Sequence, residues 1–121
     1  MFDTSKEMAL AIAEAASNKK AHDIVLMKME GLTVATDYFV VCSANTTTQT
    51  RAIADEVEEK LEEAGVSFSH KEGYREGEWI LMDYGDVIIN ILTKEMREKY
   101  NIERVWGDCE IIAELGGEES L

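Results

Sequence analysis

The stretch from Trp79 to Leu92 constrains the fold most, because two apolar runs of strand length flank a short polar segment there. That segment is Asp83-Tyr84-Gly85-Asp86. Gly and Asp favour tight turns, and the β-branched and aromatic residues around them favour strands. The stretch therefore predicts a β-hairpin. The charged residues that follow predict a helix from about Lys94 to Tyr100.

Further strands are predicted upstream of this hairpin. His22 to Glu30 and Thr36 to Ser43 contain apolar runs, and Val66 to His70 predicts a third, shorter strand. The run from Tyr38 to Cys42 is apolar without alternation. Such a run is typical of a strand with both faces covered.

Two longer helices are predicted around these strands. Thr4 to Asn18 is rich in alanine, and Thr4 with Glu7 has the spacing of a capping box. A second helix follows the candidate caps at Asn45 to Thr48, and Gly65 ends it. Its apolar positions recur on one face at Ile53, Val57 and Leu61.

This order of elements predicts an α/β fold, a single layered domain with a mixed, about five-stranded sheet and helices packed on it. The helix between the second and third strands should form a right-handed crossover between parallel strands. The domain is expected to span residues 1–108. Residues 109–121 form an acidic C-terminal tail, which is compatible with a short terminal helix.

The charge balance limits the classes of partner. The chain has 121 residues with 25 acidic and 12 basic side chains, a net charge of −13. Such a chain lacks the general basic face that direct nucleic-acid binding or an anionic membrane surface requires. A basic protein is a suitable partner, although the charge also promotes solubility alone. No apolar run is long enough to span a membrane and the N-terminus has no basic signal region, so a cytoplasmic location is expected.

No residue pattern predicts a metal or a catalytic nucleophile. The candidate ligands His22, His70, Cys42 and Cys109 have no zinc-site spacing, and the two cysteines are interpreted as free thiols. Cys42 ends an apolar run and has no identifiable base, so a structural role is favoured over a reactive one.

Three weaker candidates remain. Ser43 to Thr48 lies before a helix, where anions can bind, but lacks the glycines of a phosphate-binding loop. Asp83 and Asp86 have the chemistry to hold a divalent metal, yet turn-forming bonds to nearby amides are the better interpretation. Trp106 is predicted in the core, whereas Trp79 is equally compatible with the core and with a protein interface.

An ordered set of motifs resembles the Iojap family of ribosomal silencing factors (RsfS) over roughly residues 5 to 108. The motifs are Asp37-Tyr38-Phe39-Val40-Val41-Cys42-Ser43, Ala52-Ile53-Ala54, Glu72-Gly73, the run from Trp79 to Ile89, Glu95-x-Arg97-x-x-Tyr100 and Glu103-x-x-Trp106.

The resemblance implies a fold like that of nucleotidyltransferases without their catalytic motif, and a role that is not enzymatic and needs no cofactor. It implies a homodimer that binds the large ribosomal subunit through its L-fourteen protein. Binding there would block association with the small subunit and repress translation under nutrient limitation.

The resemblance also implies which side chains bind the partner. Carried over by position, they are Trp79, Asp83, Tyr84, Asp86, Glu95, Arg97 and Tyr100. The chain departs from the family pattern with Asn90 in place of a usual His and with Thr48 near a usual Arg. The alternative is a metal-dependent nucleotidyltransferase-like enzyme that uses Asp83 and Asp86; an acidic oligomeric scaffold is a third possibility.

Overall fold

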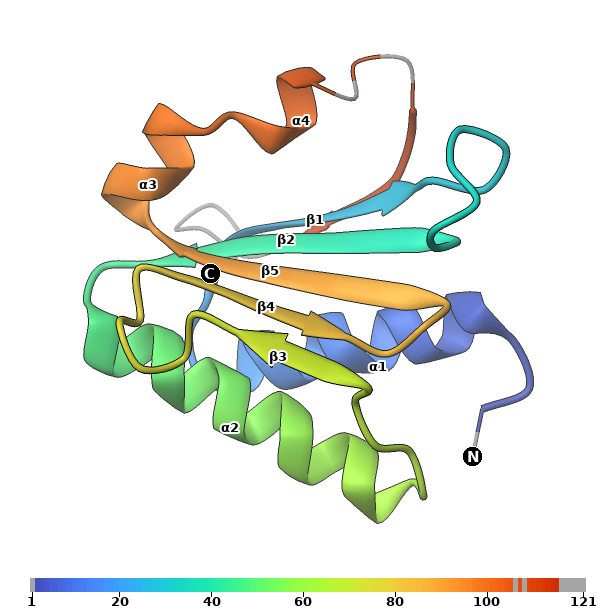
Figure 1. The fold of residues 1–121 in the computed structure, drawn as a ribbon, viewed down its shortest axis with the longest axis horizontal. Helices are drawn as coiled ribbons and strands as arrows, with labels where there is room; N and C mark the ends of the chain where they lie inside the picture. The colour runs from blue at the N-terminus through green and yellow to red at the C-terminus, as the bar shows by residue number, and fades with distance from the viewer. Residues whose placement is uncertain (1, 106, 108, 116–121) are drawn as a thin grey trace.

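A mixed sheet crosses the molecule, with strands in the order β3-β4-β5-β2-β1-β6 (Figure 1). The computed structural model describes residues 2–105, 107 and 109–115. The strands are β1 (His22–Lys28), β2 (Tyr38–Ala44), β3 (His70–Glu72), β4 (Trp79–Asp83), β5 (Val87–Thr93) and β6 (Glu110–Leu115). The helices are α1 (Ser5–Asn18), α2 (Thr47–Glu63), α3 (Lys94–Lys99) and α4 (Ile102–Val105). The predicted layered α/β fold is confirmed, with six strands rather than about five in the described part.

The sixth strand comes from the segment for which a short terminal helix was expected, and that expectation is wrong. β6 pairs antiparallel with β1, and Met27 lies opposite Ile111. Without β6, the outer edge of β1 would present unpaired backbone N–H and C=O groups. Pairing with a distant strand therefore outweighs a helical pattern only six residues long. Residues 116–121 of the predicted tail, and Trp106, lie outside the described residues.

The predicted hairpin is confirmed as β4 and β5, which pair antiparallel from Trp79↔Leu92 to Asp83↔Ile88. β5 then pairs parallel with β2. The strand predicted at 66–70 instead begins at His70 and forms β3, on the outer side of β4. β3 runs in the same direction as β2 but is not its neighbour, because β4 and β5 lie between them.

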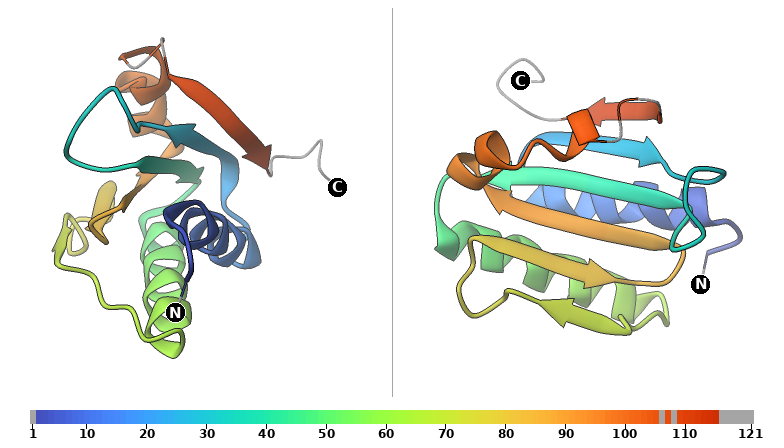
Figure 2. Two further views of the ribbon diagram at one scale, coloured as in Figure 1. Left: turned by 90° about the vertical axis from the view of Figure 1, so that its right-hand side faces the viewer. Right: turned by 45° about the horizontal axis from the view of Figure 1, so that its top comes forward.

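α1 and α2 lie side by side on one face of the sheet (Figures 1 and 2). Thr4 caps α1 by accepting from the Glu7 N–H at 3.1 Å, while the Glu7 carboxylate accepts from the Asp3 N–H at 3.0 Å. The buried positions of α1 are mostly alanines, which allow a helix to lie close to its neighbours. α2 buries its predicted face with Ile53, Val57 and Leu61. No helix of the described residues is long and apolar enough to cross a membrane.

α3 and α4 lie on the other face and cover only part of it (Figure 2, right). The buried cluster on this side is much smaller than the one under α1 and α2. Its members are Val25, Met27, Met29, Val41, Leu92 and Ile102, with Phe39, Trp79, Met96 and Cys109 packed against them. The outer strands β3 and β4 thus keep one face turned toward solvent.

Candidate functional site

The centre of the candidate site is Trp79, the first residue of β4. Its indole Nε1 donates a hydrogen bond to Asn90 Oδ1 at 3.0 Å. Its ring lies 5.3 Å from the ring of Tyr100, measured between centroids, at an interplanar angle of 40°. Such an offset, tilted pair is a favourable aromatic geometry. Trp79 is therefore half-buried and held from two sides, by β5 and by the end of α3.

The glycine-containing loop before β4 determines the position of the Trp79 backbone. Gly73 has φ +78, and a Cβ at this position would lie 2.0 Å from the Trp79 carbonyl oxygen. Only glycine combines that backbone conformation with so close an approach. Arg51 of α2 donates to the Arg75 carbonyl at 3.1 Å, and the Thr50 hydroxyl donates to the Gly77 carbonyl. α2 thus fixes the loop from which the tryptophan emerges.

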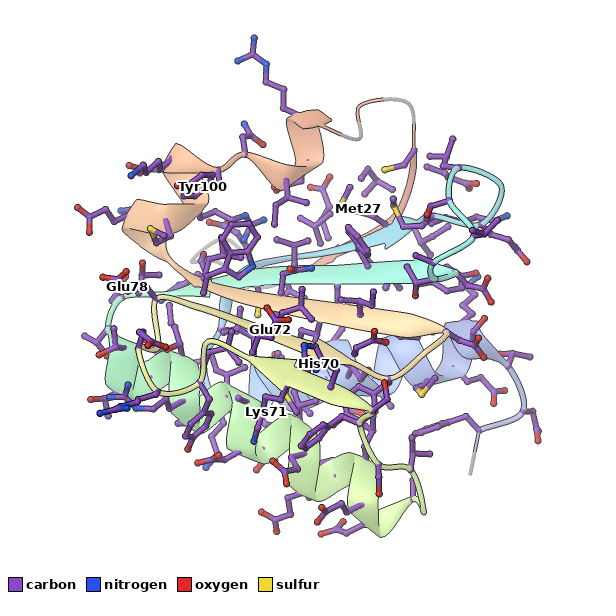
Figure 3. The ribbon with its side chains drawn as sticks, viewed as in Figure 1. Met27, His70, Lys71, Glu72, Glu78 and Tyr100 are labelled. Atoms are coloured by element: carbon purple, nitrogen blue, oxygen red, sulfur yellow. The ribbon has the colours of Figure 1, made fainter. Side chains whose placement is uncertain are left out.

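Tyr100 is the exposed member of the aromatic pair. It caps α3, with its N–H donating to the Met96 carbonyl at 2.8 Å. Its side chain is 43% exposed, and Lys99 Nζ lies 5.4 Å from the ring centroid. Figure 3 shows Tyr100 on the side of the sheet that carries α3 and α4. The pair is thus an aromatic feature that remains accessible at the border of the uncovered sheet face.

Arg97 stabilises this arrangement from within. Its Nη2 lies 2.6 Å from Glu103 Oε2 and its Nε lies 3.3 Å from Oε1, so the ion pair is bidentate. The Arg97 side chain is only 11% exposed. Burial acts to raise the pKa of the Glu103 carboxyl, but the hydrogen bond and charge of Arg97 outweigh it and lower the pKa. The geometry gives Arg97 a role in joining α3 to α4.

The two aspartates of the polar hairpin turn use different groups to form it. Asp83 Oδ1 accepts from the Gly85 N–H at 2.7 Å, and Gly85 has φ +86, as the turn interpretation requires. Asp86 uses its carbonyl to accept from the Asp37 and Tyr38 N–H groups at 2.9 and 3.1 Å. Its side chain is exposed. The turn is therefore supported by backbone groups, and the Asp83 carboxylate is partly used within it.

Tyr84 lies on the opposite face from Trp79. It is 8% exposed and belongs to the cluster under α1 and α2, where its ring meets the Phe68 ring edge to face. Burial, reinforced by the negative charges of Glu58 and Glu62, raises the pKa of Tyr84. The structure does not bring Tyr84 together with the other predicted partner-binding residues. Glu95, in contrast, is exposed in the first turn of α3.

Sequence reasoning missed two half-buried apolar residues, Leu81 and Ile88, on the same sheet face as Trp79. The strand register places Asp83, Ile88 and Phe39 in one row across β4, β5 and β2. A second row contains Glu72, Leu81 and Asn90. Leu81, Ile88 and Phe39 are half-buried rather than buried. Counting every second residue from Trp79 would have identified Leu81, because side chains on a strand alternate between faces. The same alternation places Asp83, which the family resemblance already implied, on this face.

Exposed carboxylates lie on the edge strand and at the start of β4, along one side of this open face. Glu72 is exposed and contacts His70, and both project from the edge strand β3 (Figure 3). Lys71, between them, instead points to α2 and pairs with Glu58 at 2.9 Å. The exposed Glu78 lies next to Trp79, at the end of the sheet where α3 begins. The face therefore combines half-buried apolar side chains with an acidic border.

The other chemical candidates find structural explanations. Thr46 caps α2 by accepting from the Gln49 N–H at 3.1 Å, and Gln49 also accepts from the Asn45 N–H at 3.1 Å. Cys42 is fully buried, which raises the pKa of its thiol to about 12. Within the described ranges, no group of three His, Cys, Asp or Glu side chains has a geometry suited to a metal ion.

Comparison with known proteins gives a consistent result. The family model described as "Ribosomal silencing factor during starvation" matches residues 2–120. The chain is 38% identical over 104 residues to "Ribosomal silencing factor RsfS" of Bacillus subtilis (strain 168), covering 86% of this chain and 88% of that protein. It is 30% identical to "Protein Iojap, chloroplastic" of Zea mays, covering 84% of this chain and 44% of that protein.

A solved structure shows the same fold. The crystal structure of a Chromobacterium violaceum protein superimposes with a TM-score of 0.84 at 34% identity, covering 86% of this chain and 87% of that one. Sequence and structure thus agree over most of the domain. The chain belongs to the family of ribosomal silencing factors during starvation.

Proposed function

We propose that this protein represses translation by binding the large ribosomal subunit through the open sheet face and the Trp79–Tyr100 pair. Bound there, it blocks association with the small subunit. The family supports a role at the ribosome. The observation that carries the proposal is the aromatic pair, held by a hydrogen bond and a ring contact beside an uncovered, acid-bordered sheet face.

The physical chemistry of this face suits a basic protein. Aromatic anchors that are ordered before binding lose little conformational entropy in the complex, and tryptophan and tyrosine contribute much of the energy at interfaces. Carboxylates at the border, on a chain of net charge −13, attract a positively charged surface and speed its encounter. We propose the L-fourteen protein of the large subunit as this partner, as the family resemblance implies.

The mechanism we propose is steric and requires no bond-making step. A domain anchored where the two subunits meet excludes the small subunit for as long as it stays bound. The partner-binding set is Trp79, Tyr100 and the exposed acids Asp86 and Glu95, with Asp83 at the hairpin turn. We further propose that the protein acts in the cytoplasm and forms homodimers.

Cosedimentation with purified large subunits tests the proposal. Wild-type protein should pellet with large subunits and then prevent added small subunits from joining. Trp79→Ala should weaken binding by about 30-fold or more, the effect of losing a central interface anchor. Leu10→Ala is the matched control, because Leu10 is an apolar residue of α1, 41% exposed, on the other side of the sheet.

Two results would contradict the proposal. In the first, wild-type protein stays in the supernatant at low and moderate salt. In the second, Trp79→Ala pellets and blocks joining as well as wild type does. Because the attraction is partly electrostatic, wild-type binding should also weaken as salt rises.

A further inference from the structure

The indole N–H of Trp79 is already used inside the molecule. An indole nitrogen has one hydrogen to donate and accepts no hydrogen bond, and here it donates to Asn90 Oδ1 at 3.0 Å. A partner that binds at Trp79 therefore meets the ring surface without a free donor. This limits the chemistry by which the tryptophan can recognise anything.

Asn90 is an unusual residue for its position. It is 3% exposed in β5, and its strand neighbours on either side are Val41 of β2 and Leu81 of β4. The next residue of β5 on the same face, Leu92, belongs to the buried cluster. A buried amide among apolar side chains is costly unless it is hydrogen-bonded, so the bond to Trp79 offsets a penalty that an aliphatic residue would avoid.

The hydrogen bond and the ring contact act on the same side chain from different elements. Asn90 holds the indole nitrogen from β5, and Tyr100 holds the ring from the end of α3. Together the two contacts restrict the two side-chain torsions of Trp79. With the hydrogen bond removed, the indole loses one of these two restraints and its N–H is left without that acceptor.

We propose that Asn90 is the positioning residue for Trp79 in partner binding: it fixes the indole and occupies its N–H, so that the partner is recognised by the ring surface alone. This inference rests on the proposed function. The group that it predicts on the partner is an aliphatic side chain or the aliphatic stem of a lysine or arginine, and not a hydrogen-bond acceptor. Asn90 acts through Trp79 and does not itself contact the partner.

A double-mutant cycle tests this coupling, with affinity for purified large subunits as the readout. The variants are Asn90→Leu, Trp79→Phe and the two combined. Asn90→Leu alone leaves the indole N–H without its acceptor and should weaken binding at least about fivefold. In the Trp79→Phe background there is no N–H to satisfy, so adding Asn90→Leu should change affinity by less than about twofold.

A spectroscopic readout separates positioning from general stability. In a proton–nitrogen spectrum, the Trp79 indole N–H signal, assigned by its loss in Trp79→Phe, should move when Asn90 is replaced by Leu. Met27→Ala is the control, because Met27 is fully buried in the same cluster but lies on β1, away from Tyr100 (Figure 3).

The outcomes distinguish this inference from the proposed function. An equal loss from Asn90→Leu in both tryptophan and phenylalanine backgrounds, or a similar loss in Met27→Ala, would overturn the positioning role. Unchanged binding by Asn90→Leu would overturn it as well. If wild-type protein fails to bind large subunits at all, the proposed function fails, and so does the role of Asn90 in partner binding. The indole signal would still report whether Asn90 orients Trp79.

Discussion

The two faces of the sheet use similar residues for different purposes. Ile88 and Ile89 are neighbours in β5, yet Ile89 is fully buried under α1 and α2 while Ile88 is half-buried on the other face. The first face is closed by two long helices with apolar stripes. The second is covered only in part by α3 and α4, and α3 contributes no buried residue. Identical side chains therefore stabilise the fold on one face and remain available to a partner on the other.

Under the proposed function, this difference assigns stability to one face of the sheet and partner binding to the other. A closed face gains free energy in proportion to the apolar area removed from water. An open face gives up part of that stabilisation and leaves apolar area exposed, which under the proposed function contacts the partner. Substitutions on the two faces should therefore affect different measurements, in a predictable order of size.

The largest effect is expected for Ile89→Ala on the closed face. Removing a buried isoleucine side chain leaves a cavity beneath the helices, and the free energy of unfolding should fall by about 2–5 kcal/mol. Urea denaturation monitored by circular dichroism measures this. A loss no larger than that of Ile88→Ala would contradict the contrast between the faces.

A smaller loss is expected for Glu103→Gln, which removes the charge from the ion pair with Arg97 on the partly covered face. The expected loss of unfolding free energy is about 1 kcal/mol, because Glu103 is 31% exposed and solvent screens the pair. Thermal unfolding of the two proteins at pH 7 checks the difference.

The same pair predicts a dependence on pH. The pKa of Glu103 in the folded protein is lowered from the ordinary 4.5. Its contribution to stability is therefore present above the unfolded pKa and is lost as the pH falls through the folded pKa. The stability difference between wild type and Glu103→Gln should stay constant above about pH 4.5 and shrink as the pH falls below it. A difference that does not shrink there would exclude the carboxylate as its source.

Ile88→Ala should change stability little and binding more. Since Ile88 is half-buried, its truncation should cost at most about 1 kcal/mol of unfolding free energy. If the open face contacts the ribosome, affinity for large subunits should fall about threefold to tenfold. Paired measurements of unfolding and cosedimentation, beside Ile89→Ala, would show whether the two isoleucines differ as their faces do.

The last prediction changes no residue and compares the reactivity of the two thiols in the folded protein. Cys42 lies in the closed cluster, and burial raises its pKa to about 12, so it should not react with an aromatic disulfide reagent while the protein is folded. Cys109 is only partly buried, with its pKa raised by that burial. It should react slowly under native conditions, and Cys42 only after unfolding. Rapid native labelling of Cys42 would show that the closed face opens readily.

Local patterns in the sequence were sufficient for most elements. The hairpin at Trp79 to Leu92, the caps at Thr4 and Thr46 and the apolar stripe of α2 all depend on residues a few positions apart. These patterns do not depend on distant segments, because turn formation, capping and helix periodicity involve residues close together in the sequence.

The sequence indicated which elements carry the candidate site better than it indicated which of their residues share one face. Trp79, Glu95 and Tyr100 fall around the open face, whereas Tyr84 points into the opposite cluster. Because consecutive strand residues alternate between faces, a one-residue difference in register decides whether a side chain is core or surface. Because β4 and β5 carry apolar residues on both faces, their sequences show no polar alternation that would indicate which face is exposed.

The sequence by itself determined α1, α2 and α3, the hairpin, the acidic character and the family, because these depend on local chemistry and ordered motifs. Only the tertiary structure decided that residues 110–115 complete the sheet as β6 and that Asn90 binds the indole of Trp79. It also decided that one sheet face stays open. The reason is physical: strand pairing and side-chain contacts join segments far apart in the chain, and their free energy depends on which partners the whole fold brings together.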